Sequence, residues 1–214
     1  MTLIQPKDGT SKRIAANAKV RIDRGPVVVV SPVDFSFCEL KSIAEVLDED
    51  PRPSPEVFGV QSSSKGKNGK SSSKSIKFNN NKLPNVNGLN AFVETFLVDI
   101  HALCWLDLSF NNLKIIDTEI LGFPNLKILN LHENKIVDIS EVDKLRSLQN
   151  LKKLSLYGNP LASRGYRMMV LSKLKQLEEF DFSRITRAER MTSDTLHHFG
   201  QGSKPKTVRT EDDE

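Results

Sequence analysis

The side chains in this sequence that could do chemistry are few and widely spaced. Asp107, Ser109 and His132 are the three types that form a hydrolase triad, in which a carboxylate orients the histidine and the histidine takes the serine proton. A triad also needs an oxyanion hole and a site that excludes water. Whether these three residues meet those demands depends on the elements that carry them.

Metal and nucleotide chemistry have little support. No carboxylate or thiol stands at ligand spacing from any of the histidines, which are His101, His132, His197 and His198. Cys38 and Cys104 lie far apart and belong to no C-x-x-C pair, which argues against a zinc site or a disulfide framework and fits a reducing compartment. Neither a G-x-G-x-x-G segment nor a P-loop occurs. We therefore expect no metal and no cofactor.

The bulk composition sets further limits. The chain has 214 residues, of which 38% are hydrophobic and 27% charged, so it can form a core over part of its length. The first residues contain no apolar signal-peptide core, and the run Val27 to Val30 is too short to cross a bilayer. The sequence predicts a soluble, intracellular protein that is a monomer on its own.

One run of lysines is concentrated enough to notice. It falls in a segment made almost entirely of Ser, Lys, Gly and Asn and consists of Lys65, Lys67, Lys70, Lys74 and Lys77. Such a run is usually a solvated tether, and it can also lie against an acidic surface such as RNA or the tails of tubulin. No aromatic residues alternate with the lysines, and the net charge of +4 is mild, so nucleic-acid binding is not favoured.

Internal repeats explain the second half of the chain. The pattern L-x-x-L-x-L-x-x-N-x-L fits "LCWLDLSFNNL" from Leu103, "LKILNLHENKI" from Leu126 and "LKKLSLYGNPL" from Leu151. A weaker copy, "SIKFNNNKL", comes earlier, and a partial copy, "LEEFDFS" from Leu177, comes last. Three full matches indicate a solenoid, in which each coil buries its apolar face only by stacking on its neighbours.

Each position of the repeat has a physical role. The two leucines around a central polar residue face the core from a short strand. The asparagine carries both donor and acceptor groups, so it can satisfy backbone groups where the chain leaves the strand. Stacked coils would form an asparagine ladder of Asn81, Asn111, Asn134 and Asn159.

The remaining segments are read from periodicity and composition. An amphipathic helix is predicted on the convex side, with apolar residues Leu89, Phe92, Val93, Phe96, Leu97 and Ile100 at helical spacing. Later coils have room only for short turns or single helical turns. A further helix should seal the last coil, and the cap residues are Tyr166, Arg167, Phe180 and Phe182.

These features divide the chain into five parts. They are a flexible arm (1–34), a short helical segment (35–50), a Ser/Lys/Gly-rich linker (51–74), the repeat domain with its cap (75–192) and a partly disordered tail (193–214).

The repeat places solvent-facing strand residues in columns on a concave sheet. We expect a partner to bind there, at Trp105, Asp107, Ile128, Asn130, His132, Lys153 and Tyr157. Trp105 and Ile128 would be neighbouring apolar groups on a face where polar residues suffice, and such clusters mark interaction sites. The alternative is that Trp105 is covered by the chain's own N-terminal segment. A triad on this open, wet face would lack an oxyanion hole, so we reject it.

Several motifs give the chain a family resemblance. The short coils, "GNPL" at Gly158, "YR" at Tyr166 and the "FDFSRITRAER" ending resemble the short-coil leucine-rich repeat proteins with a C-terminal cap. The "DFSF" box near Phe35, "FNNNKL" and "WLDLSFN" are more specific motifs that resemble one member of this group. The resemblance runs from about residue 33 to 195. It implies an α/β leucine-rich-repeat solenoid with a short curved parallel sheet. The polar composition before residue 75 adds the expectation of a largely disordered N-terminal third.

The resemblance also shapes the functional hypotheses. The group includes a spliceosomal A′ protein, an axonemal dynein light chain and a phosphatase regulator. We expect a non-enzymatic adaptor that binds another protein, in a ciliary or microtubule-associated assembly. The alternatives are an RNA-associated scaffold and a phosphatase-regulatory module.

Overall fold

A curved sheet of short strands organises the chain. The computed structural model describes residues 29–53, 60–61, 69–161 and 165–200. Over these ranges the main sheet has seven strands: β2 (Val33–Asp34), β4 (Ser75–Lys77), β5 (Trp105–Asp107), β6 (Ile128–Asn130), β7 (Lys153–Ser155), β8 (Glu179–Phe180) and β9 (Ser183–Arg184). Six run parallel in chain order, and β9 pairs antiparallel with β8. A short parallel pair forms separately from β1 (Val29–Val30) and β3 (Val60–Gln61).

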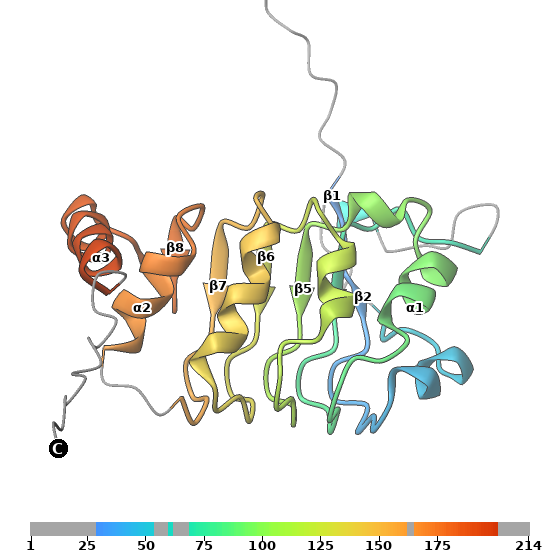
Figure 1. Cartoon of the computed structure of the whole chain (residues 1–214). Coiled ribbons are helices and arrows are strands. Elements are labelled where there is room, and N and C mark those ends of the chain that lie inside the picture. Colours follow the sequence, from blue (N-terminus) through green and yellow to red (C-terminus); the bar gives the residue numbers. More distant parts are fainter. Residues whose placement is uncertain (1–28, 54–59, 62–68, 162–164, 201–214) are drawn as a thin grey trace, which may run out of the picture.

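Helices cover one face of this sheet. Figure 1 shows the strands side by side in sequence order, with the helices in front of them. The convex helices are η1 (Ile43–Asp48), α1 (Leu89–Phe96), η2 (Ile100–Ala102), η3 (Thr118–Gly122) and η4 (Ile139–Ser147). The predicted amphipathic helix is confirmed in α1, which ends at Phe96, and the later coils have only 3₁₀ segments, as their short loops predict. Aspartates cap three of these segments: Asp99, Asp117 and Asp138.

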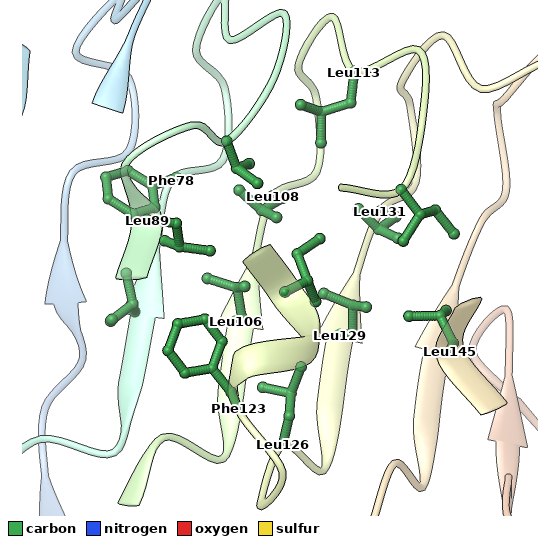
Figure 2. Packing of buried hydrophobic residues seen from close by; sticks show 14 of the residues in the cluster. Phe78, Leu89, Leu106, Leu108, Leu113, Phe123, Leu126, Leu129, Leu131 and Leu145 are labelled. Carbon is green, nitrogen blue, oxygen red and sulfur yellow. The ribbon is translucent and has the colours of Figure 1, made fainter. Parts of the chain in front are cut away.

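The core lies between the strands and the convex segments. The strand leucines Leu106 and Leu129 are fully buried, and Phe123 and Leu145 meet them from the helical side. Figure 2 shows these side chains converging from successive coils into one continuous layer. The α/β solenoid predicted from the repeat is therefore confirmed.

The sheet begins one coil earlier than the sequence analysis places it. We expected an arm and a short helical segment before residue 75, but Val33 pairs with Ile76 and Phe35 is fully buried. The Phe35 ring stacks on Phe78 at 5.8 Å between centroids. "VDFSFCEL" has the spacing of the repeat. This coil was not recognised from the sequence because Cys38 occupies the position of the repeat asparagine.

The asparagine ladder explains why the first coil can lack an asparagine. Asn134 donates from Nδ2 to the carbonyl of Leu108 in the preceding coil at 2.9 Å, and its Oδ1 accepts from the N–H of Leu113 at 3.0 Å. Each ladder side chain thus serves the coil before it. Asn81 does the same for the first coil, accepting from the N–H groups of Cys38 and Leu40. Among the described residues, no strand precedes β2 in the main sheet, so the first coil has no earlier coil to serve there.

Asn111 and Asn159 complete the series. Asn111 donates to the carbonyl of Phe78 at 2.9 Å and accepts from the N–H of Leu83 at 3.1 Å. Asn159 accepts from the N–H of Ile136 at 3.0 Å and is the most exposed member, since it alone is half-buried.

A second column runs beside the ladder. The residue before each ladder position has a left-handed backbone, with φ between +53° and +73°, at Phe37, Asn80, Phe110, Glu133 and Gly158. This conformation turns the chain out of each strand, and only glycine and asparagine adopt it readily. Phe37 and Phe110 adopt it while their rings are 62% and 46% exposed.

The cap uses α2 (Tyr166–Lys173) and α3 (Arg187–Gly200), which pack on each other at the C-terminal end of the solenoid (Figure 1). Phe180 is fully buried, and the Arg167 guanidinium donates to its carbonyl at 2.8 Å. Arg167 also pairs with Glu189 at 2.7 Å, and this hydrogen bond, together with one from the N–H of Thr186, lowers the pKa of Glu189 to about 2.

The Asp181 carboxylate replaces a backbone carbonyl at the point where β8 ends. In earlier coils the N–H of the second core leucine donates to a carbonyl at the end of the next strand, as Leu131 does to Ser155. In the coil of β7, the N–H groups of Leu156 and Tyr157 donate instead to the Asp181 carboxylate, at 2.6 and 3.0 Å. The Tyr166 hydroxyl donates a hydrogen bond to the other oxygen of the Asp181 carboxylate. The pKa of Tyr166 is raised mainly because its hydroxyl is buried, and in second place because of this hydrogen bond.

Phe182 is not a cap residue, and this corrects the sequence analysis. Asp181 and Phe182 both have left-handed backbones, with φ of +47° and +61°, and form the two-residue turn of a hairpin between β8 and β9. The turn carries Phe182 out of the leucine position, so its side chain is 65% exposed.

The segments that we predicted as arm, linker and tail are only partly described. Residues 1–28, 54–59, 62–68 and 201–214 lie outside the described residues. The end of the linker is built into the domain, because the N–H of Ser71 donates to Phe96 and its carbonyl accepts from Val98. Arg52 covers the outer edge of β2, donating its N–H to the Asp34 carbonyl at 2.7 Å. The first residues of the tail continue α3 to Gly200.

Candidate functional site

The concave face presents the columns that the repeat spacing predicts. Trp105 pairs in register with Ile128, Ile128 with Lys153, and Lys153 with Glu179. The next outward-facing column holds Asp107, Asn130 and Ser155 on the same three central strands.

A pocket of about 250 Å³ opens in these columns. Its lining is Trp105, Ile128, Asn130, Lys153, Leu154, Ser155, Glu179 and Phe182. Trp105 and Ile128 form one apolar wall, and the Phe182 ring, projecting from the hairpin turn, forms another. A salt bridge of 2.7 Å between Lys153 and Glu179 borders the pocket. The site is therefore an apolar hollow with a polar rim.

Trp105 contacts a lysine on the neighbouring strand β4. Its side chain is half-buried, and the Lys77 ammonium lies 5.7 Å from the ring centroid, within the range of a cation–π contact. Lys77 is itself held by Asp34 at 3.7 Å. The indole Nε1 is buried and has no hydrogen-bond partner among the described residues. Residues 1–28 of the N-terminal arm, which we considered as an alternative cover for Trp105, lie outside those residues.

A chain of hydrogen bonds crosses the second column. Ser109 Oγ donates to Asp107 Oδ1 at 2.6 Å, and Asn130 Nδ2 donates to Asp107 Oδ2 at 2.9 Å. Ser155 Oγ lies 3.4 Å from Asn130 Oδ1 and 2.8 Å from His132 Nδ1. The polar floor of the site is thus a connected network whose groups fix one another's orientation.

This geometry separates the three residues that resembled a triad. Ser109 bonds the carboxylate of Asp107 directly, whereas His132 bonds Ser155 at the far end of the network. The aspartate therefore orients a serine and an asparagine rather than the histidine. The order of contacts differs from the one that serine nucleophile activation requires.

His132 also joins two aromatic side chains. Its ring lies edge-on to Phe110 at 5.3 Å and to Phe182 at 5.1 Å between centroids. Of these three rings, Phe182 lines the pocket. Sequence reasoning did not include Phe182 in the site, because its leucine-like spacing assigned it to the cap. Leu154, Ser155 and Glu179 also line the pocket and were not among the predicted site residues.

The predicted site residues fall into three groups. Trp105, Ile128, Asn130 and Lys153 line the pocket, and Asp107 and His132 belong to the network around it. Tyr157 lies outside the pocket lining, with 61% of its side chain exposed.

Two other kinds of site have no support in the described residues. No helix there combines the length and the apolar character needed to cross a membrane. No cluster of three or more His, Cys, Asp or Glu side chains there has the arrangement of a metal site.

Comparisons with known proteins agree with the fold. A family profile described as leucine-rich repeat matches residues 74–208. The chain is similar to leucine-rich repeat-containing protein 51 of Mus musculus, at 39% identity over 183 residues that cover 85% of this chain and 92% of that protein. Its similarity to the Homo sapiens protein of the same name is 37% over 180 residues, covering 84% and 90%.

More distant likenesses involve the U2 A' protein. U2 small nuclear ribonucleoprotein A' of Schizosaccharomyces pombe is 35% identical over 86 residues, which cover 40% of this chain and 35% of that protein. Among solved structures, the Drosophila melanogaster SNF/U2A' complex contains a chain that matches with a TM-score of 0.51 and 24% identity, covering 60% of this chain and 71% of that one. This second likeness shows the fold alone.

Proposed function

Because the chain belongs to the leucine-rich repeat family and is a homologue of leucine-rich repeat-containing protein 51, we propose that it is a non-enzymatic scaffold that holds another protein against its concave face. The interacting residues in this proposal are Phe182 and six of the seven predicted residues, since Tyr157 is left out. The six are Trp105, Asp107, Ile128, Asn130, His132 and Lys153.

The observation that carries the proposal is the apolar hollow between Trp105, Ile128 and Phe182. Outward-facing strand positions need only polar residues, yet here two of them are large and apolar, and the hairpin turn adds a third. Burying one large apolar side chain in such a hollow contributes about 1.5–3 kcal/mol, and tryptophan is a favoured anchor at interfaces.

The polar network supports a binding role rather than a catalytic one. Its serine, aspartate and asparagine groups already bond one another, so they act as a fixed floor. Preorganised side chains lose little conformational entropy when a partner binds. The non-enzymatic part of the proposal rests on this arrangement and on the family.

We propose a ciliary or microtubule-associated assembly as the cellular setting, on the strength of the resemblance to axonemal repeat proteins. The similarity to the U2 A' protein supports the competing proposal of an RNA-associated scaffold. Localisation of the tagged chain in ciliated cells distinguishes the two: enrichment in the cilium supports the first, and enrichment in the nucleus the second.

Proximity labelling with crosslinking in cells tests the concave site. The wild type is compared with Trp105→Ala, and Val137→Ala is the matched control, because Val137 is 57% exposed but lies outside the pocket. We expect a set of partners that is lost with Trp105→Ala and kept with Val137→Ala. If Trp105→Ala keeps every partner while both variants remain folded by circular dichroism, the concave site is not the binding site.

A further inference from the structure

Lysines occupy a row of stacked positions directly before the strands that carry the apolar wall of the pocket. The residues just before Trp105 and Ile128 are Cys104 and Lys127, and the flanking coils place Lys74 and Lys152 in the same row. Backbone bonds fix this order, since Cys104 N donates to Lys74, Lys127 N to Cys104 and Lys152 N to Lys127, at 2.8–2.9 Å. Three of these four neighbouring positions therefore carry an ammonium group.

The lysines differ in how far their charges are already neutralised. Lys152 pairs with Glu178 at 3.3 Å, and Lys153 pairs with Glu179 at 2.7 Å. Lys74 and Lys127 are exposed and form no ion pair within the described part of the chain. The uncompensated positive charge therefore lies at the Trp105 and Ile128 end of the pocket.

This distribution of charge defines the occupant. We propose that the pocket binds an acidic peptide segment of a partner protein, with one large apolar side chain inserted between Trp105, Ile128 and Phe182 and adjacent carboxylates meeting Lys74 and Lys127. The proposal rests on the proposed scaffold function and adds the chemistry of the partner. Lysine stems are long enough to reach carboxylates on a chain that crosses the pocket rim.

A peptide fits this surface better than a nucleic acid does. The same face carries the carboxylates of Asp107, Glu178 and Glu179, which would repel a continuous line of phosphates. A peptide can place its few carboxylates beside Lys74 and Lys127 and leave the opposite end neutral. The apolar hollow likewise suits an aliphatic or aromatic side chain.

A peptide-display selection against the full chain tests the proposal. The baits are the wild type, Trp105→Ala, and the double variant Lys74→Glu/Lys127→Glu. The matched control is Lys114→Glu/Lys135→Glu, which changes the same charge at exposed lysines on the loops after the ladder. The most enriched peptide is then synthesised and its affinity for each variant measured by fluorescence anisotropy at low and high salt.

We expect enriched peptides to combine a large apolar residue with nearby Asp or Glu. Reversing Lys74 and Lys127 should weaken binding about tenfold, and the control pair less than about twofold, because charge pairs act at short range. High salt should weaken binding to the wild type.

Three results would overturn the proposal. Peptides that need Trp105 but show neutral or basic flanks would remove the acidic preference while leaving the scaffold function intact. Enrichment equal on the wild type and Trp105→Ala, or no enrichment, would remove the pocket as a peptide site. A labelled oligouridine RNA that binds more tightly than the selected peptide and depends on Trp105 would assign the surface to RNA.

Discussion

The asparagine ladder gives the most quantitative prediction. Asn134→Ala removes an amide that is 2% exposed and serves backbone groups in two coils. The N–H of Leu113 loses its partner. The carbonyls of Leu108 and Leu131 each lose one bond but keep another, from Asn111 and Asn159. One buried backbone group left unpaired costs about 1–3 kcal/mol and each further lost bond about 0.5–1.5 kcal/mol, so we expect a loss of about 2–5 kcal/mol in the free energy of unfolding.

Urea denaturation followed by circular dichroism measures this loss. With a slope of about 1–3 kcal/mol per molar urea, the midpoint should fall by about 1–2 M. Asn125→Ala is the control, because Asn125 is exposed and donates one bond, to the His101 carbonyl at 3.0 Å. Its cost should stay within about 0.5 kcal/mol.

The first coil supplies a second comparison. Cys38 occupies the ladder position there, and β2 is the edge strand of the main sheet in the described part of the chain, so Cys38→Ala should cost much less than Asn134→Ala. Asn159→Ala should fall between them, because Asn159 makes the same bonds but is more exposed. Equal costs at Cys38 and Asn134 would refute the idea that each ladder residue stabilises the preceding coil.

The remaining predictions concern the cap, the pocket and one turn. The pKa of Glu189 is about 2 in the folded protein against an ordinary 4.5, so its stabilising effect is present above pH 4.5 and is lost as the pH falls towards 2. Glu189→Gln removes this titration. The melting temperature of the variant, measured by calorimetry, should therefore fall less between pH 4.5 and pH 2 than that of the wild type. Phe182→Ala should leave the melting temperature within a few degrees, because the ring is 65% exposed, but should abolish the partner crosslinks lost in Trp105→Ala. Gly158→Ala should cost about 1–2 kcal/mol in urea titrations, because its φ is +73° and an added Cβ would lie 2.3 Å from the Glu133 carboxylate; an unchanged midpoint would contradict this.

Local spacing was enough to predict most of the solenoid. Leu106, Leu108 and Asn111 lie within one short segment, and the role of each follows from the strand period and the turn that ends it. The same reasoning predicts the register of Trp105 on Ile128, because equivalent positions of successive coils must stack.

The features that the sequence did not predict depend on what lies beside each coil. The coil at Val33 was missed because Cys38, and not asparagine, stands at its ladder position. A cysteine can replace the asparagine there because no preceding coil among the described residues needs the amide. Phe182 was misplaced because its position follows from the hairpin turn, which replaces a further parallel strand. The pocket was not predicted as a cavity because one of its walls is Phe182.

The backward direction of the ladder makes the two ends of the repeat array different for the addition of a coil. A coil added before β2 would need an asparagine in place of Cys38, and it would have to displace Arg52, whose N–H donates to the Asp34 carbonyl at the outer edge of β2. A coil inserted between β7 and β8 would have to displace Asp181, whose carboxylate accepts from the N–H groups of Leu156 and Tyr157. Gene duplication at the beginning of the array therefore has to move one covering segment, whereas duplication at its end separates the hairpin and the cap helices from β7.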